Sequence, residues 1–207
     1  MHRSARFLLF WGLWCWAGVV WGQSNSRDNP QLFVAVYNDA AIPKATLLGA
    51  EDKASTIYRR ARVELHWLNS PASRPELAVR VIPRSRNLAN DIFGVAFLDS
   101  NGFGRQADVF YNNIAELSAA WSQNEAELLG CVMAHEIGHL LLGSNSHSPT
   151  GIMQLHWDGQ QLHLASLGQL GFDRKEIRKI HQRLPMHERI LARNQTCGPG
   201  SPPFCGR

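Results

Sequence analysis

Residues 135–153 read HEIGHLLLGSNSHSPTGIM, and the first five of them place two histidines four positions apart. In a helix, side chains at i and i+4 lie on one face about one turn apart, so His135 and His139 can reach the same metal ion. Glu136 follows the first histidine and can act on a water molecule held at that ion. The spacing predicts a catalytic zinc site, with His135 and His139 as ligands and Glu136 as general base.

A catalytic zinc ion takes three protein ligands and keeps one position open, so a third ligand is needed. His147 is the favoured candidate, because Gly143 can end the helix and let the chain double back below the metal. The other candidates all lie further along the chain: His156, Asp158, His163 and Glu176. Asn145 is nearer, but an amide is a poor zinc ligand. The remaining histidines of the folded chain are expected to be surface or packing residues: His66, His181 and His187.

The segment from His135 to Met153 resembles the metzincin clan of zinc endopeptidases, whose signature is HExxHxxGxxH followed by a methionine turn. The resemblance implies an α+β domain: a mixed twisted sheet with an N-terminal helix, an active-site helix, a Met-turn and a C-terminal helix. It also implies Zn2+ as cofactor and a protein or peptide as substrate. Residues 94–96 and 102–104 loosely resemble the strand and glycine turn that precede the active-site helix in the matrixin branch.

The spacing departs from the clan signature after the helix. The glycine stands one position later, at Gly143, and the third histidine two positions later, at His147. The helix is therefore expected to be one residue longer and the loop wider. No tyrosine stands two residues after Met153, unlike in the astacin and serralysin branches. No cysteine stands between the N-terminal apolar run and Cys131, so a matrixin-type cysteine-switch propeptide is not expected.

The N-terminus has the three parts of a secretory signal peptide. Basic residues at positions 2–6 precede an almost wholly apolar run over residues 7–21, and small Gly22 precedes a polar segment. We expect residues 1–22 to be a signal peptide, 23–207 to be one catalytic domain, and the protein to be secreted or periplasmic. The apolar run is short for a bilayer span, so no stable membrane association is expected after cleavage.

Composition excludes other classes of partner. The net charge of +4 falls to +2 once Arg3 and Arg6 are removed, and no basic cluster is interleaved with aromatic residues. Nucleic-acid binding is therefore not expected, and the protein is expected to be a monomer. Cys197 and Cys205 flank a Gly/Pro-rich tail segment, CGPGSPPFC, and are the expected disulfide pair in an exported protein. Cys131 is interpreted as a buried small side chain or as a thiol near the metal.

Hydrophobic periodicity and turn residues predict the remaining elements. Expected strands cover residues 31–37, 63–68, 76–82, 93–98 and 107–111. A helix is expected from about 43 to 61. Ser122 and Glu125 form a capping-box pattern at the start of the metal helix. Asp173 is expected to cap a last helix that runs to about His181, is interrupted at Pro185 and resumes over 186–194.

These patterns together favour a secreted zinc metallopeptidase. Two alternatives share the zinc helix: a non-proteolytic zinc-binding module, and a zinc amidase acting on a non-peptide substrate. The intact Glu136 argues against the first, since a structural zinc site has no need of a general base. A calcium site at Asp99, Asn101 and Asp108 is a further hypothesis. The alternative is that these three are ordinary solvated turn residues.

Overall fold

The computed structural model describes residues 29–68, 75–84, 89 and 91–196, with side chains described as far as residue 185. The expected signal peptide and the Cys197–Cys205 pair lie outside the described residues. Among the described residues, no helix has the length and apolar character that crossing a membrane requires.

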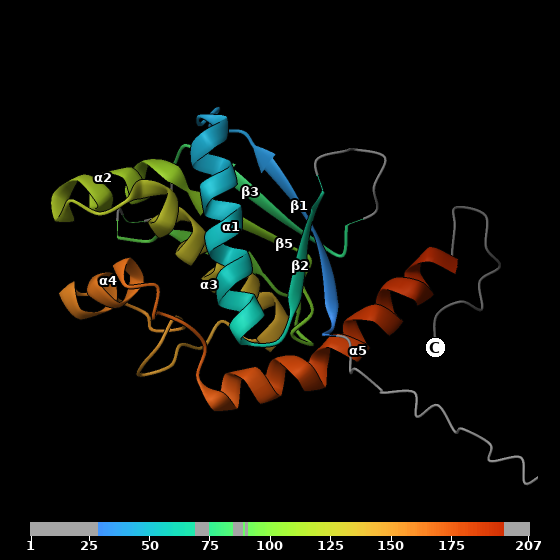
Figure 1. Ribbon diagram of the computed structural model, residues 1–207. Helices are drawn as coiled ribbons and strands as arrows, with labels where there is room; N and C mark the ends of the chain where they lie inside the picture. The colour runs from blue at the N-terminus through green and yellow to red at the C-terminus, as the bar shows by residue number, and fades with distance from the viewer. Residues whose placement is uncertain (1–28, 69–74, 85–88, 90, 197–207) are drawn as a thin grey trace, which may run out of the picture.

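A five-stranded mixed sheet forms one layer of the molecule, in the order β2-β1-β3-β5-β4 (Figure 1). Its strands are β1 (Gln31–Asn38), β2 (Glu64–Leu68), β3 (Leu77–Ile82), β4 (Gly94–Phe97) and β5 (Gln106–Phe110). Neighbouring strands are parallel except for β4, which lies antiparallel to β5 with Gly94 opposite Val109. Side chains alternate between the two faces of a strand, and in β3 alternate residues from Leu77 onward are buried. All five expected strands are confirmed.

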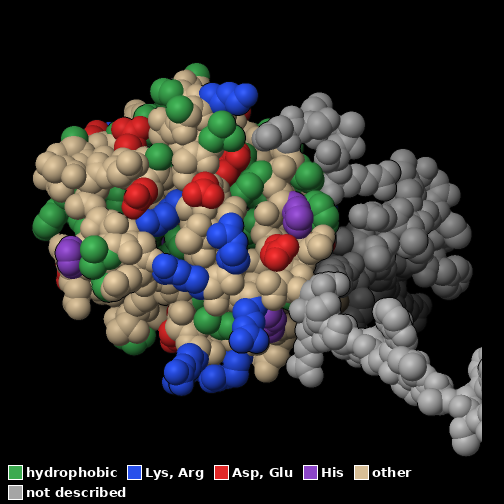
Figure 2. Space-filling model, in the orientation of Figure 1, with side chains coloured by type: hydrophobic (Ala, Val, Ile, Leu, Met, Phe, Trp, Pro, Cys, Tyr) green, Lys and Arg blue, Asp and Glu red, His purple; other side chains and the backbone are tan. Residues whose placement is uncertain are grey.

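Helices α1 (Lys44–Arg60) and α3 (Glu125–Leu142) form the second layer and cover one face of the sheet (Figure 1). The two helices cross closely, because Gly130 lacks a side chain: a Cβ there would stand 2.5 Å from the carbonyl oxygen of Ala50. Every residue of α3 from Leu128 to Leu142 is buried, as expected of a helix that is apolar on all sides. Figure 2 shows charged side chains of both signs spread over the face that α1 occupies.

The start of α3 differs from the capping box predicted at Ser122. Asn124 is the N-cap, and its side chain accepts a hydrogen bond of 3.1 Å from the backbone N–H of Glu127. Ser122 instead ends α2 (Tyr111–Trp121), a helix that the sequence analysis missed, in a left-handed conformation with φ of 50°. At the other end the prediction is confirmed, since Gly143 terminates α3 with φ of 62°.

The C-terminal part holds α4 (Gly159–Ser166) and α5 (Arg174–Thr196), of which only the second was predicted. Asp173 caps α5 as expected, accepting hydrogen bonds from the N–H groups of Lys175 and Glu176. The predicted interruption at Pro185 is wrong, because α5 continues through it. Ile180 and Leu184 are buried in the core just before this proline, and their packing holds the helix where its own hydrogen bonding is weakened.

Candidate metal centre

His135 and His139 lie one turn apart on α3 with their rings directed to the same point. Their Nε2 atoms are 3.0 Å apart, and the two side chains are 8% and 4% exposed. This helix is buried from Leu128 to Leu142, so the spacing of the two rings is set by rigid backbone. Both histidines face one site, as their spacing in the sequence predicts.

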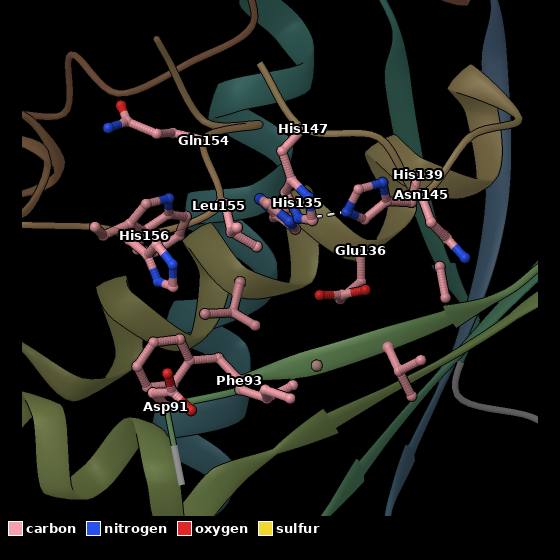
Figure 3. A pocket seen from close by; sticks show the side chains of 16 residues that line it. Asp91, Phe93, His135, Glu136, His139, Asn145, His147, Gln154, Leu155 and His156 are labelled. Carbon is pink, nitrogen blue, oxygen red and sulfur yellow. Dashed lines mark hydrogen bonds between the residues drawn. The ribbon is translucent and has the colours of Figure 1, made fainter. Parts of the chain in front are cut away.

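His147 reaches this point from the loop after α3 (Figure 3). Its ring centroid lies 5.4 Å from that of His135 and 4.9 Å from that of His139. One nitrogen from each of the three rings lies within 4.8 Å of the other two. Among the described residues, these histidines are the one group of His, Cys, Asp or Glu side chains close enough to hold a metal ion together.

Backbone carbonyls fix the orientation of both helix histidines. His135 donates from Nδ1 to the carbonyl oxygen of Ile152 at 2.6 Å, and His139 donates from Nδ1 to that of Ser144 at 2.8 Å. A carbonyl oxygen only accepts, so each Nδ1 carries the proton and each Nε2 keeps its lone pair. This is the arrangement of a metal-ligating histidine with its outer hydrogen bond in place.

Burial favours the neutral form of the three imidazoles, of which His147 is the most exposed. It lowers the pKa of His135 to about 3, with His139 adding to the effect. Burial likewise lowers the pKa of His139 and of the more exposed His147. Neutral imidazole is the form that binds metal, so the site needs little proton release to accept an ion.

The expected turn at Met153 lies against α3 on the side of the histidines. Met153 is fully buried, and Gly138 makes room for it: a Cβ at residue 138 would stand 2.7 Å from the sulfur. The turn is closed by a hydrogen bond of 2.8 Å from the Ser148 N–H to the Met153 carbonyl. The same turn carries the Ile152 carbonyl, so it supports the ring of His135 directly.

The other candidates for a third ligand are held elsewhere. Asp158 caps α4, accepting from the Gln160 N–H at 2.7 Å. Glu176 accepts from the Ser148 hydroxyl and, at 2.7 Å, from the Asp173 N–H. His163 is exposed on α4, and His156 lines the same cavity without joining the group of three.

The histidines expected to be packing residues lie away from the site. His66 stacks on Phe33 with ring centroids 5.0 Å apart. His181 donates a hydrogen bond from Nε2 to the carbonyl oxygen of Ala61 at 2.7 Å. The side chain of His187 lies outside those that the structure describes.

Glu136 lies beside the histidines with an unpaired carboxylate. Its side chain is 4% exposed, its Oε2 has no hydrogen-bond partner among the described residues, and burial raises its pKa to about 8. Gly94 at the start of β4 provides the space, because a Cβ there would stand 2.6 Å from Glu136 Oε1. A buried carboxyl oxygen without a partner is costly unless it serves a ligand, which marks Glu136 as a functional group.

The histidines and Glu136 line a cavity of about 280 Å³. It lies between β4, α3 and the segment 154–157 (Figure 3). Three nitrogen donors and one orphaned carboxylate in an open cavity fit zinc, which prefers such donors and leaves a position for water in catalytic sites. The part that Gly94 plays was not predicted from the sequence, although a glycine at the start of a strand is the signal that could have pointed to it.

Burial and hydrogen bonds bear on two further hypotheses, a thiol near the metal at Cys131 and a calcium site at Asp99. Cys131 is fully buried, its thiol pKa is raised to about 12 by burial, and it does not join the histidine group, so the buried-residue interpretation holds. Asp99 Oδ1 accepts from the N–H groups of Asn101 and Phe103 at 2.8 and 2.9 Å. It therefore stabilises a turn, and the calcium hypothesis finds no support.

Comparisons with known proteins give partial likenesses. No family model and no curated protein matches the chain. Among solved structures, it is similar to archaemetzincin from Methanopyrus kandleri, with 16% identity, 78% of this chain and 99% of that chain covered, and a TM-score of 0.47. It is also similar to a zinc-dependent peptidase from Methanocorpusculum labreanum, with 15% identity, 71% and 99% covered, and a TM-score of 0.48. At these identities and TM-scores, neither similarity assigns a family or an activity to this chain.

Proposed function

We propose that this protein is a secreted zinc-dependent metallopeptidase that hydrolyses internal peptide bonds. One observation carries the proposal: three histidine nitrogens converge beside the buried, unpaired carboxylate of Glu136, in a cavity open to solvent. A structural zinc site is closed by four protein ligands and has no use for such a carboxylate. The arrangement therefore supports catalysis over a purely structural role.

His135, His139 and His147 would hold the ion through Nε2 of the first two and a ring nitrogen of the third. When bound there, zinc supplies a Lewis acid that polarises a carbonyl and lowers the pKa of water. The Ile152 and Ser144 carbonyls keep the two helix imidazoles in the ligating tautomer. They also raise the basicity of these ligands.

Glu136 would act as the general base and then as the general acid. In its ionised form, Glu136 accepts a proton from the attacking water and returns it to the leaving amine. Because the side chain is 4% exposed and bounded by Gly94, bulk water does not compete for its unpaired oxygen. The close fit against Gly94 also limits the positions that the carboxyl group can adopt.

A peptide would bind in extended form along β4. This strand pairs with β5 on one side and lies at the edge of the described sheet, so its other side can hydrogen-bond to a peptide backbone. Gly94 at its start places that edge next to Glu136. Leu155 and Trp157 would then line the pocket for the residue after the cleaved bond. Residues 94–96 of this strand line the cavity, and an extended peptide bound along them suits an endopeptidase.

The test is zinc content and casein hydrolysis measured on the secreted protein and on the Glu136→Gln variant. We expect the variant to keep one zinc per chain and to lose hydrolysis, because the amide cannot accept the proton. Glu116→Gln, a surface position paired with Arg84, is the matched control and should keep both properties. Full activity of Glu136→Gln would overturn the mechanism, and zinc without hydrolysis in the wild type would favour the binding-module alternative. N-terminal sequencing of the exported protein tests cleavage after Gly22.

A further inference from the structure

The cavity extends to one side of the histidines, and its walls there are apolar. Val132 lies one turn before His135 on α3 and is 3% exposed. The Trp157 ring meets the His135 ring edge-on, with centroids 6.0 Å apart. Phe93, half-buried just before β4, and Leu155 line the same region. A side chain next to the cleaved bond would therefore enter an apolar pocket that starts at the metal centre itself.

Asp91 stands at the far end of this pocket. Figure 3 shows it near Phe93 and on the side of His156, away from His139 and Asn145. Asp91 and Glu136 are the two carboxylates among the lining residues, and Glu136 belongs to the metal centre. Asp91 is exposed and makes no hydrogen bond or ion pair within the described part of the chain. Its charge is thus available to a group that enters the pocket.

We propose that this pocket takes a lysine or arginine side chain, so that the enzyme cleaves peptide bonds followed by a basic residue. The inference rests on the proposed function. Walls formed by Val132 and Leu155 fit the methylene stem of such a side chain, which buries its stem and keeps its charged head near water. The aromatic rings of Phe93 and Trp157 line the pocket and can attract a cation, and Asp91 pairs with it at the open end.

The same features set the order of preference among other side chains. A methionine has an apolar stem but no charge, so it fits between the apolar walls but forms no ion pair with Asp91. A glutamate brings a second negative charge next to Asp91 and is disfavoured. We expect the basic residue to exceed methionine about threefold in kcat/KM, the size of one exposed charge pair.

The experiment uses quenched-fluorescent peptides that are identical except after the cleaved bond, where they carry Lys, Arg, Met or Glu. Mass spectrometry fixes the cleavage site in each. In Asp91→Asn, kcat/KM should fall for the Lys and Arg peptides and stay unchanged for the Met peptide. In Asp91→Lys, the preference should move to the Glu peptide. Asp52→Asn, exposed on α1 and outside the cavity, is the control and should leave every ratio unchanged. An unchanged Lys-to-Met ratio in Asp91→Asn would overturn the inference.

Failure of this inference can be told apart from failure of the proposed function. Binding of the fluorescein-labelled Lys and Met peptides to zinc-loaded Glu136→Gln is measured by fluorescence anisotropy, which needs no hydrolysis. Tighter binding of the Lys peptide that is lost on adding Asp91→Asn supports the pocket even where the wild type cleaves nothing. Equal binding of both peptides contradicts it even where the wild type is an active peptidase. Circular dichroism of each variant confirms that it is folded.

Discussion

Gly94 lies directly against Glu136: a Cβ on residue 94 would stand 2.6 Å from Glu136 Oε1 and 2.7 Å from Cδ. The carboxyl group can occupy its present position because β4 begins with a residue that has no side chain. The relationship joins the sheet edge, along which we place the substrate, to the group that we propose moves the proton.

Gly94→Ala should therefore displace the Glu136 carboxylate while leaving the histidines in place. We expect zinc content to be retained and kcat to fall by about 100-fold, since a displacement of about 1 Å in a catalytic group has effects of this size. The measurement is peptide hydrolysis together with zinc stoichiometry. Gly171→Ala is the matched control, because a Cβ there has nothing within 4 Å. Normal kcat in Gly94→Ala would show that the position of Glu136 does not limit the reaction.

A second glycine, Gly138, supports the metal centre through packing. An alanine at this position would bring a Cβ to 2.7 Å from the Met153 sulfur and 2.9 Å from Cε1 of Phe172. Overpacking of this kind costs about 1–3 kcal/mol. We expect Gly138→Ala to lower the free energy of unfolding in urea by this amount, and to cost less in a Met153→Ala background, which is itself destabilised but no longer has the sulfur in the way. Wild-type stability of Gly138→Ala would mean that the turn at Met153 does not press on α3.

The identity of the third ligand is tested by removing His147. Its ring nitrogen joins the group of three, whereas His156 lines the same cavity outside that group. We expect His147→Ala to weaken zinc binding about tenfold or more, since even outer hydrogen-bond partners of ligands contribute that much. Competition with a chromophoric chelator measures the affinity. His156→Ala is the control, and the reverse result, with only His156→Ala losing zinc, would move the ligand to His156.

Local patterns were enough to predict much of this site. The i, i+4 spacing places His135 and His139 on one face whatever the rest of the fold does. Gly143 ends the helix because glycine readily adopts the left-handed backbone conformation. Apolar runs, alternation and turn residues likewise predicted all five strands. The cap of α3 was misplaced because Ser122 and Asn124 are both good N-cap residues, and only the end of α2 decides between them.

Relationships between distant segments could not be predicted in this way. The contact of Gly94 with Glu136 depends on β4 lying next to α3, and no local pattern reports the order of strands in a sheet. The Ile152 and Ser144 carbonyls are backbone groups, so no residue type announces their role. Pro185 was misread for the same reason, because tertiary packing of α5 outweighs the local preference of proline.

Removal of the metal should abolish activity without unfolding the chain. The core between α1, α3 and the sheet is built from apolar side chains and does not depend on an ion, so the zinc-free protein should keep its far-ultraviolet circular dichroism. Zinc binds the folded site and not the separated ligands, so saturation at 100 times Kd should stabilise the fold by about 2.7 kcal/mol. Thermal unfolding with and without zinc measures this difference, and zinc added to the metal-free protein should restore hydrolysis.

In His147→Ala the zinc-dependent rise in Tm should shrink. The Tm of the metal-free variant should stay near that of the metal-free wild type, because the His147 side chain is exposed. Loss of the folded state on chelation would instead make zinc a structural ion and would count against a preformed catalytic centre.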